Sequence, residues 1–333
     1  MAGAPIIDLS QPLATLLREG TKQAHTEAET SQGAKLLLGG KLPKDEYVRF
    51  LMTLWYVYDA IERALDRHAA YPTLEPTYNP TLLARAPALA ADISYLLDVP
   101  ADKWQSHPMH KALCTPSLPS ALQTYVSRLD ALADSADPSP LLAHSYVRYL
   151  GDLSGGQSIK RIIAKAYGLD AGLAGAGELD GGSESGVSFY IFKELRSAGP
   201  ASIGEMKRIK DWFRDGMNVA GERCASGEAK LAIVEEASNA FRLNMGLFSA
   251  IRSEPAATNK EEGEESKVVF DASNTQTEAS WPLASVAAFI AAACLAHFII
   301  VVGGFTGNRG YEKLLAIDEW VREAFQQFST GSA

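Results

Sequence analysis

Cysteine is scarce in this sequence. Three are present among 333 residues, and no two of them form a C-x-x-C pair: they are Cys114, Cys224 and Cys294. The odd number and the wide spacing argue against a disulfide scaffold and against a structural zinc site. We therefore expect the chain to fold in a reducing compartment.

Positive charge is also in short supply. The 31 Lys and Arg residues are outnumbered by 40 Asp and Glu residues, which gives a net charge of -9. Binding along the phosphate backbone of a nucleic acid draws on an excess of basic side chains. No nucleic acid is therefore expected as a partner, while a local basic patch is compatible with this total.

Three further signals are missing. Residues 1–11 have neither a basic start nor an apolar run, so no secretory signal is predicted there. Alternation of apolar and polar residues, which marks a half-buried strand, is rare along the chain. The dinucleotide fingerprint G-x-G-x-x-G is also absent.

Helical periodicity, in contrast, is abundant. Hydrophobic residues make up 47% of the chain, which is enough for a sizeable core. They recur at helical spacing in segments 47–65, 120–132, 141–150, 203–216 and 229–251. Residues 168–186 are a glycine-dense loop. We predict one all-α domain over residues 1–252.

The C-terminal part of the sequence has a different composition. Residues 253–280 are rich in Glu, Asn, Ser and Thr and predict a flexible acidic tether. Residues 281–303 predict a transmembrane anchor, because 283–302 carry no formal charge and a helix of about 20 residues crosses a bilayer core. A buried core helix is the alternative. Residues 304–333 predict a short tail with an amphipathic helix.

His25 and Glu29 form the first segment of chemical interest. They are four residues apart, so both side chains lie on one face of a predicted helix. A neutral imidazole is a good iron ligand, and a carboxylate that accepts its other N–H would fix its tautomer. Such pairs also occur by chance, so the spacing alone is weak support for a metal ligand.

The second segment is YVRYLGDLSGGQSIKRIIAKAYGL, residues 146–169. Three glycines, Gly151, Gly155 and Gly156, interrupt a strongly amphipathic helix, at a cost of roughly 1 kcal/mol each relative to alanine. Missing side chains let the backbone approach a large flat ligand, with the Asp152 carboxylate beside it. Close packing of two helices through the same glycines explains the pattern equally well.

At this point the sequence resembles a known family. The run RYLGDLSGG matches the signature of heme oxygenases, and LREGTKQAHTEAE resembles their proximal-histidine segment. KDWFRDGMN and EEASNAFRLNMGLF also match, and the similarity covers about residues 10–250 in the family's order. The resemblance implies a heme oxygenase-like helical bundle. A C-terminal membrane anchor also occurs in eukaryotic members of the family.

The resemblance implies roles for the residues on either side of the heme. His25 corresponds to the proximal ligand of the heme iron, and Glu29 to its nearby carboxylate. A neutral histidine ligand leaves the opposite face of the iron free for O2. On that face, Asp152 matches the carboxylate that organises distal water and supplies protons. The residues that match the distal helix around it are Gly151, Gly155 and Gly156.

Other positions match the edges of the family's heme pocket. Members of the distal polar network correspond to Tyr58, Arg148 and Asn244. Groups that hold the heme propionates correspond to Arg18, Lys210, Arg214 and Tyr146. Phe241 and Phe248 match aromatic wall positions, and ordinary core packing explains them equally well. Two departures are notable: Arg18 stands where animal members have lysine, and Val147 where they have threonine.

The resemblance implies an enzyme that uses O2 to open heme into biliverdin, Fe²⁺ and CO. Heme b is then both the substrate and the cofactor that activates oxygen. Because the chain has no dinucleotide fingerprint, electrons are expected from NADPH through a flavoprotein reductase. The anchor implies insertion after synthesis, with the catalytic domain facing the cytosol, most naturally at the endoplasmic reticulum. A non-catalytic heme sensor or carrier and a membrane adaptor without heme are the alternatives.

Overall fold

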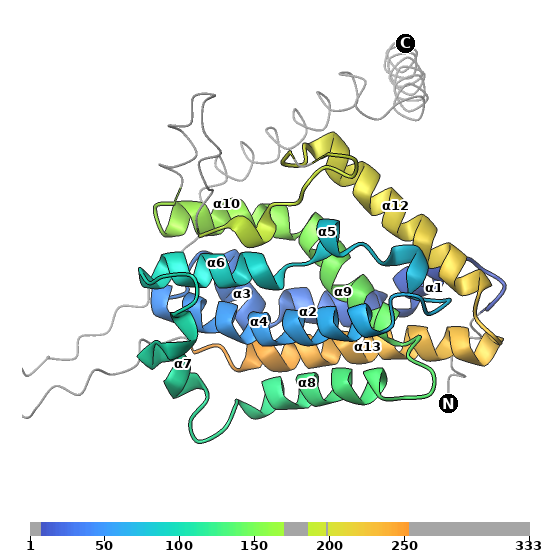
Figure 1. Cartoon of the computed structure of the whole chain (residues 1–333), viewed down its shortest axis with the longest axis horizontal. Helices are drawn as coiled ribbons and strands as arrows, with labels where there is room; N and C mark the ends of the chain where they lie inside the picture. The colour runs from blue at the N-terminus through green and yellow to red at the C-terminus, as the bar shows by residue number, and fades with distance from the viewer. Residues whose placement is uncertain (1–7, 170–185, 198, 253–333) are drawn as a thin grey trace, which may run out of the picture. The chain divides into compact units, whose positions relative to one another are not determined.

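The computed structural model describes residues 8–169, 186–197 and 199–252 (Figure 1). They belong to one compact unit, Met1–Asn259. In the described ranges the regular structure is helical, with one isolated antiparallel bridge between Lys193 and Pro200. The all-α prediction is confirmed.

The helices follow one another along the chain with short connections. The α-helices are α1 (Leu13–Gly20), α2 (Lys22–Thr30), α3 (Gln32–Leu38), α4 (Lys44–Arg67), α5 (Pro80–Leu83), α6 (Ala86–Leu97), α7 (Pro108–Leu113), α8 (Ser120–Ala133), α9 (Leu141–Ser154), α10 (Gly156–Ala166), α12 (Ile203–Glu222) and α13 (Gly227–Ser249). The 3₁₀ turns are η1 (Glu75–Thr77), η2 (Trp104–Ser106) and η3 (Ser188–Tyr190).

Helix α4 is the centre of the core. Its apolar residues Leu51, Leu54, Tyr58, Ile61 and Leu65 recur every three or four positions, and all are buried. The helix packs against α6 and α8, between which it runs in Figure 1, and it also contacts α9. Because α9 also packs on α13, residues from α4, α9 and α13 meet in one interior region.

Two helices differ in length from the sequence prediction. The helix expected at 203–216 continues to Glu222, because Gly216 is a packing glycine and does not end the helix. A Cβ atom there would lie 2.6 Å from the Pro76 carbonyl oxygen, so the missing side chain lets α12 approach η1. The helix expected at 141–150 continues to Ser154 and is then interrupted at Gly155, where α10 begins anew.

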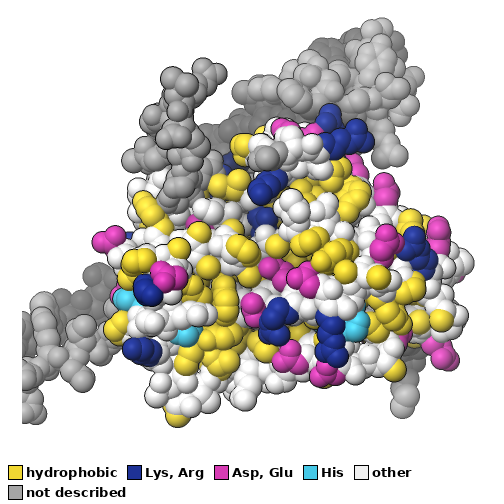
Figure 2. Space-filling model, in the orientation of Figure 1, with side chains coloured by type: hydrophobic (Ala, Val, Ile, Leu, Met, Phe, Trp, Pro, Cys, Tyr) yellow, Lys and Arg dark blue, Asp and Glu magenta, His cyan; other side chains and the backbone are white. Residues whose placement is uncertain are grey.

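The charged surface mixes both signs. On the face drawn in Figure 2, acidic and basic side chains are interspersed with apolar ones. This face therefore lacks the continuous basic stripe that a nucleic-acid-binding protein presents.

The predicted C-terminal features lie outside the described residues. These are the tether at 253–280, the anchor at 281–303 and the tail at 304–333, and most of the glycine-dense loop is likewise not described. Among the helices that the structure describes, none combines the length and the apolar character needed to cross a bilayer.

Candidate functional site

A large cleft opens between the N-terminal helices and the α9–α10 break. Its volume is about 790 Å³, and helices α1, α2, α3, α9, α12 and α13 contribute to its walls. Apolar side chains cover much of it, including Leu37, Leu54, Phe50, Phe241 and Phe248. A slot of this kind suits a flat apolar ligand.

His25 lies on one wall of the cleft, on α2. Its Nδ1 atom is 3.6 Å from Glu29 Oε2, which is an ion-pair distance and longer than a hydrogen bond. The Phe241 ring packs edge-on against the imidazole, with centroids 5.6 Å apart. This arrangement leaves Nε2 as the ring nitrogen available to a ligand in the cleft. The predicted pairing of His25 with Glu29 is therefore present as a contact, without the expected hydrogen bond.

Glycines on α9 and α10 line another part of the cleft. A Cβ atom added to Gly151 would meet nothing within 4 Å, and one added to Gly155 would meet only the Gly151 carbonyl oxygen at 3.6 Å. These two glycines therefore face open space, which excludes close helix packing as their explanation. Gly156 differs, because its Cβ would lie 3.3 Å from the Tyr190 ring.

Asp152 lies among these glycines and is buried, while still lining the cleft. The Tyr58 hydroxyl on α4 donates a hydrogen bond to its Oδ2 atom. Burial raises the pKa of Asp152 to about 6, against the opposing effects of Arg148, the Tyr58 hydrogen bond and Arg85. The carboxyl group can thus exchange a proton near neutral pH.

Arg148 lies at the centre of the polar network behind Asp152. Its Nε donates to the Tyr58 hydroxyl at 3.1 Å, and its Nη1 donates to Asn244 Oδ1 at 2.7 Å. The guanidinium also lies 4.8 Å from the centroid of the Tyr58 ring. Burial acts to lower the pKa of Arg148, but Tyr58 and Asp152 raise it, so the cation is retained.

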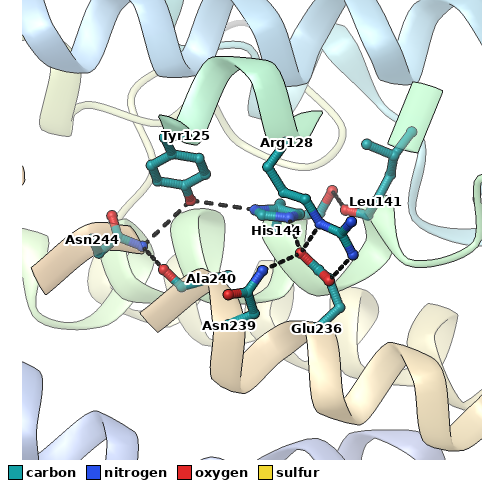
Figure 3. Close-up of polar contacts among 9 residues, drawn as sticks. Tyr125, Arg128, Leu141, His144, Glu236, Asn239, Ala240 and Asn244 are labelled. Carbon is teal, nitrogen blue, oxygen red and sulfur yellow. Dashed lines mark hydrogen bonds and ion pairs between the residues drawn. The ribbon is translucent and has the colours of Figure 1, made fainter. Parts of the chain in front are cut away.

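The network continues beyond Asn244 to a second buried carboxylate (Figure 3). Asn244 Nδ2 donates to the Tyr125 hydroxyl at 3.4 Å, and that hydroxyl lies 3.4 Å from His144 Nδ1. His144 Nε2 lies 3.0 Å from Glu236 Oε1. Arg128 Nε donates to the same oxygen at 3.0 Å.

The protonation of this second pair follows from its surroundings. Burial raises the pKa of Glu236, but hydrogen bonds from His144, Arg128 and Asn239 together bring it down to about 2. Burial lowers the pKa of His144 by more than Glu236 raises it. At neutral pH a neutral His144 therefore donates from Nε2 to the Glu236 carboxylate and accepts from Tyr125 at Nδ1.

The direction of the hydrogen bonds gives the network its function. Arg148 donates on both sides, and each branch ends at a carboxylate, Asp152 in one direction and Glu236 in the other. A chain whose donors reverse at its centre cannot pass a proton from end to end. The network instead holds Tyr58 and Asp152 in fixed orientations.

Sequence reasoning identified only one branch of this network. Tyr58, Arg148, Asp152 and Asn244 were predicted, whereas Tyr125, His144 and Glu236 were not. One signal was available for His144, since it precedes Arg148 by one helical turn and shares its helix face.

The predicted cations do not all reach the cleft. Arg18 and Arg214 line it, and each is paired with a carboxylate, Arg18 with Glu19 at 2.9 Å and Arg214 with Asp211 at 3.2 Å. Lys210 is on the same helix as Arg214 but does not belong to the cleft walls. The reason is that positions four apart on a helix diverge in angle and rise by a full turn.

The remaining predicted residues line the cleft. The Tyr146 hydroxyl lies 3.3 Å from Thr21 Oγ1, which ties α9 to the start of α2. Val147 presents an apolar side chain to the cleft. Phe248 stacks on Phe50 with centroids 5.7 Å apart, so it is at once a wall residue and part of the packing.

Comparison with known proteins agrees with this geometry. A family model described as heme oxygenase matches residues 11–250. Heme oxygenase 2 of Rattus norvegicus is 33% identical over 259 residues, which are 78% of this chain and 71% of that protein. Heme oxygenase 1 of Homo sapiens is 31% identical over 244 residues, 73% of each chain. The crystal structure of a Synechocystis heme oxygenase-2 in complex with heme and NO is similar with a TM-score of 0.58 and 33% identity, covering 72% of this chain and 85% of that one.

Proposed function

The chain belongs to the heme oxygenase family and catalyses oxidative heme degradation, and we propose that it holds heme between His25 and the α9–α10 break and opens it to biliverdin, Fe²⁺ and CO. One observation carries this assignment. A histidine with a free ring nitrogen and a buried carboxylate flanked by side-chain-free glycines line a single cleft of about 790 Å³. Such a cleft offers an iron ligand, room for a planar macrocycle and a proton-active group together.

The residues of the cleft fit heme, the substrate. His25 Nε2 would bind the iron from α2, and Glu29 would orient the ring. Bound heme supplies the iron at which O2 is activated. Gly151 and Gly155 let the backbone of α9 approach the macrocycle closely, so the shape of this wall decides which edge of heme is exposed to attack.

Asp152 is the proton-active group in this proposal. Its pKa near 6 suits a carboxyl that holds water and hands on protons at neutral pH. Tyr58 and Arg148 hold the carboxylate in place, and Asn244 holds Arg148. The charge of Arg148 keeps Asp152 from shifting further toward its neutral form.

The propionates and the electrons have separate sources. Arg18 and Arg214, with the Tyr146 hydroxyl, would bind the propionates at the rim of the cleft. Lys210 would act only as a more distant cation. Electrons would come from NADPH through a flavoprotein reductase, in line with the absence of a dinucleotide fingerprint in the chain.

The C-terminal region would place the enzyme on a membrane. The uncharged segment within 281–303 is long enough to span a bilayer, and the acidic residues 253–280 would form a leash between it and the catalytic domain. We assign the enzyme to the cytosolic face of the endoplasmic reticulum. Protease added to sealed microsomes should then cleave within residues 1–280 without detergent.

The test is turnover by the full-length protein in detergent. Hemin, reductase, NADPH and O2 are added while the Soret band and bilin absorption are followed. We expect loss of the Soret band, formation of bilin and release of CO. The His25→Ala variant should lack the normal ferrous-CO spectrum and turnover. A heme sensor or carrier would show a stable Soret band without bilin, and a membrane adaptor would show no stoichiometric heme binding.

A further inference from the structure

The η3 turn (Ser188–Tyr190) lies against the distal wall of the cleft. Phe189 and Tyr190 both line the cleft, and the Phe189 ring packs edge-on against Tyr58 with centroids 5.4 Å apart. The Tyr190 ring covers Gly156. The turn therefore contacts both the phenol that holds Asp152 and the backbone where α10 begins.

Asp92 holds the start of this turn. Its carboxylate accepts hydrogen bonds from the backbone N–H of Ser188 at 2.9 Å and of Phe189 at 2.8 Å. Asp92 is on α6, is 1% exposed and does not line the cleft. A carboxylate at the first N–H groups of a helical turn is a charged N-terminal cap.

Arg85 holds the other end. Its Nη1 donates to the Ile191 carbonyl at 2.6 Å, and its guanidinium lies 4.1 Å from the centroid of the Phe192 ring. Its other hydrogen bonds go to the carbonyls of Leu82 and Leu83 at 3.1 Å. Arg85 is 5% exposed and also lies outside the cleft walls. A cation at the last carbonyls of a turn is the complement of an anion at its first N–H groups.

A third contact joins the turn to the distal helix. Gln157 Nε2, one residue after Gly156, donates to the Tyr190 carbonyl at 2.8 Å. The turn is thus fixed to α6 by charged groups and to α10 by an amide. Neither charged residue belongs to the network centred on Arg148.

We infer that Asp92 and Arg85 are positioning residues for heme cleavage: they cap η3 at its two ends, and η3 fixes the surface that Tyr58 and the glycine turn present to the substrate. The inference rests on the proposed function, since it assigns both residues to the distal wall of that same site. The class of effect follows from this position. Loosening η3 changes how the macrocycle sits against the distal wall, and hence which of its carbons is attacked.

The test combines a readout without heme and one with heme. In the heme-free full-length protein, hydrogen exchange of the segment 186–192 should be about ten- to hundredfold faster in Asp92→Asn than in wild type, since two charge-assisted hydrogen bonds are weakened. With heme, the ratio of biliverdin isomers should shift at least threefold. Arg85→Lys, which keeps the charge but loses the planar fork, should shift both readouts in the same direction and by less.

The control is Glu46→Gln. Glu46 is also a buried carboxylate, and it accepts the backbone N–H of Arg252 at 2.7 Å on another part of the domain. This variant should lose stability without changing the isomer ratio or the exchange of 186–192. If Asp92→Asn speeds exchange while the isomer ratio stays constant, the clamp is only structural and the inference is overturned.

The remaining outcomes separate the two proposals. Absence of bilin from the wild-type protein would refute the proposed function, and the exchange experiment would still report on the clamp. If Asp92→Asn does not fold, the wild-type amides of Ser188 and Phe189 decide alone. Exchange as slow as in α4 supports the clamp, and exchange as fast as in an exposed loop overturns it.

Discussion

The Tyr58 hydroxyl donates a hydrogen bond to the Asp152 carboxylate, and the two residues come from helices that are 94 positions apart in the sequence. Tyr58 is fully buried, whereas Asp152 lines the cleft. The proton-active group of the site is therefore held from the interior of the protein. Its geometry depends on the packing of α4 against α9.

Gly151→Ala should separate stability from function. Alanine is favoured over glycine in a helix by about 1 kcal/mol, and a Cβ at this position meets no protein atom within 4 Å. We expect a variant that is more stable in denaturant but binds heme more weakly and turns over more slowly, because the methyl group enters the cleft.

Gly246→Ala on α13 is the matched control for that change. Its Cβ would make an ordinary 3.5 Å contact with Ala121 Cβ, and the residue is not part of the cleft walls. It should gain a similar stability and keep normal heme titration. An unchanged heme affinity in Gly151→Ala would show that this wall does not contact the substrate.

Asp152→Asn should make the pH dependence of stability visible. Burial raises the pKa of Asp152 in the folded protein to about 6 from 3.8, so its contribution to stability is greatest at low pH and is lost as pH rises through 6. The Asn variant lacks this titration. Its stability relative to wild type should therefore increase by about 1 kcal/mol between pH 5 and pH 7, as measured by urea unfolding.

The same variant should lose catalysis. Removal of a positioned proton-transfer group costs roughly 10²- to 10⁴-fold, so biliverdin formation should be nearly abolished while heme still binds. A normal biliverdin yield would reduce Asp152 to a structural residue.

Tyr58→Phe should move the pH profile. The Tyr58 hydrogen bond lowers the pKa of Asp152, so its loss raises that pKa above about 6. We expect the acid limb of the single-turnover rate to shift to higher pH, and stability to fall by about 1–3 kcal/mol because Arg148 Nε loses its acceptor. An acid limb at the wild-type pH would contradict the assignment of that limb to Asp152.

Glu236→Gln should test the far end of the network. The pKa of Glu236 is depressed to about 2 in the folded protein from 4.5, so its stabilising contribution is present above pH 4.5 and is lost as pH falls toward 2. The variant should be less stable by about 1–3 kcal/mol at pH 7, with the difference shrinking below pH 4. Equal losses at both pH values would argue against an ionised Glu236.

The fold class was predictable because helical periodicity is local. Leu51, Leu54 and Tyr58 recur every three or four residues, and this pattern alone places them on one buried face. The interruption near residue 155 was also visible, since glycine disfavours a helix wherever it occurs. Similarity to a known family then identified the side chains that carry the chemistry.

Only the tertiary structure decided how those side chains meet. Gly151 and Gly156 look alike in sequence, yet one faces open space and the other packs against Tyr190, because η3 returns to that point from a distant part of the chain. Asp92 and Phe189 are 97 positions apart and are joined by a backbone hydrogen bond that no local pattern encodes. Local preferences arise within a few residues, so the sequence by itself determined the helices and their buried faces. Contacts between helices depend on packing over the whole domain, and that packing alone determined the cleft, its proton-active carboxylate and the turn that supports it.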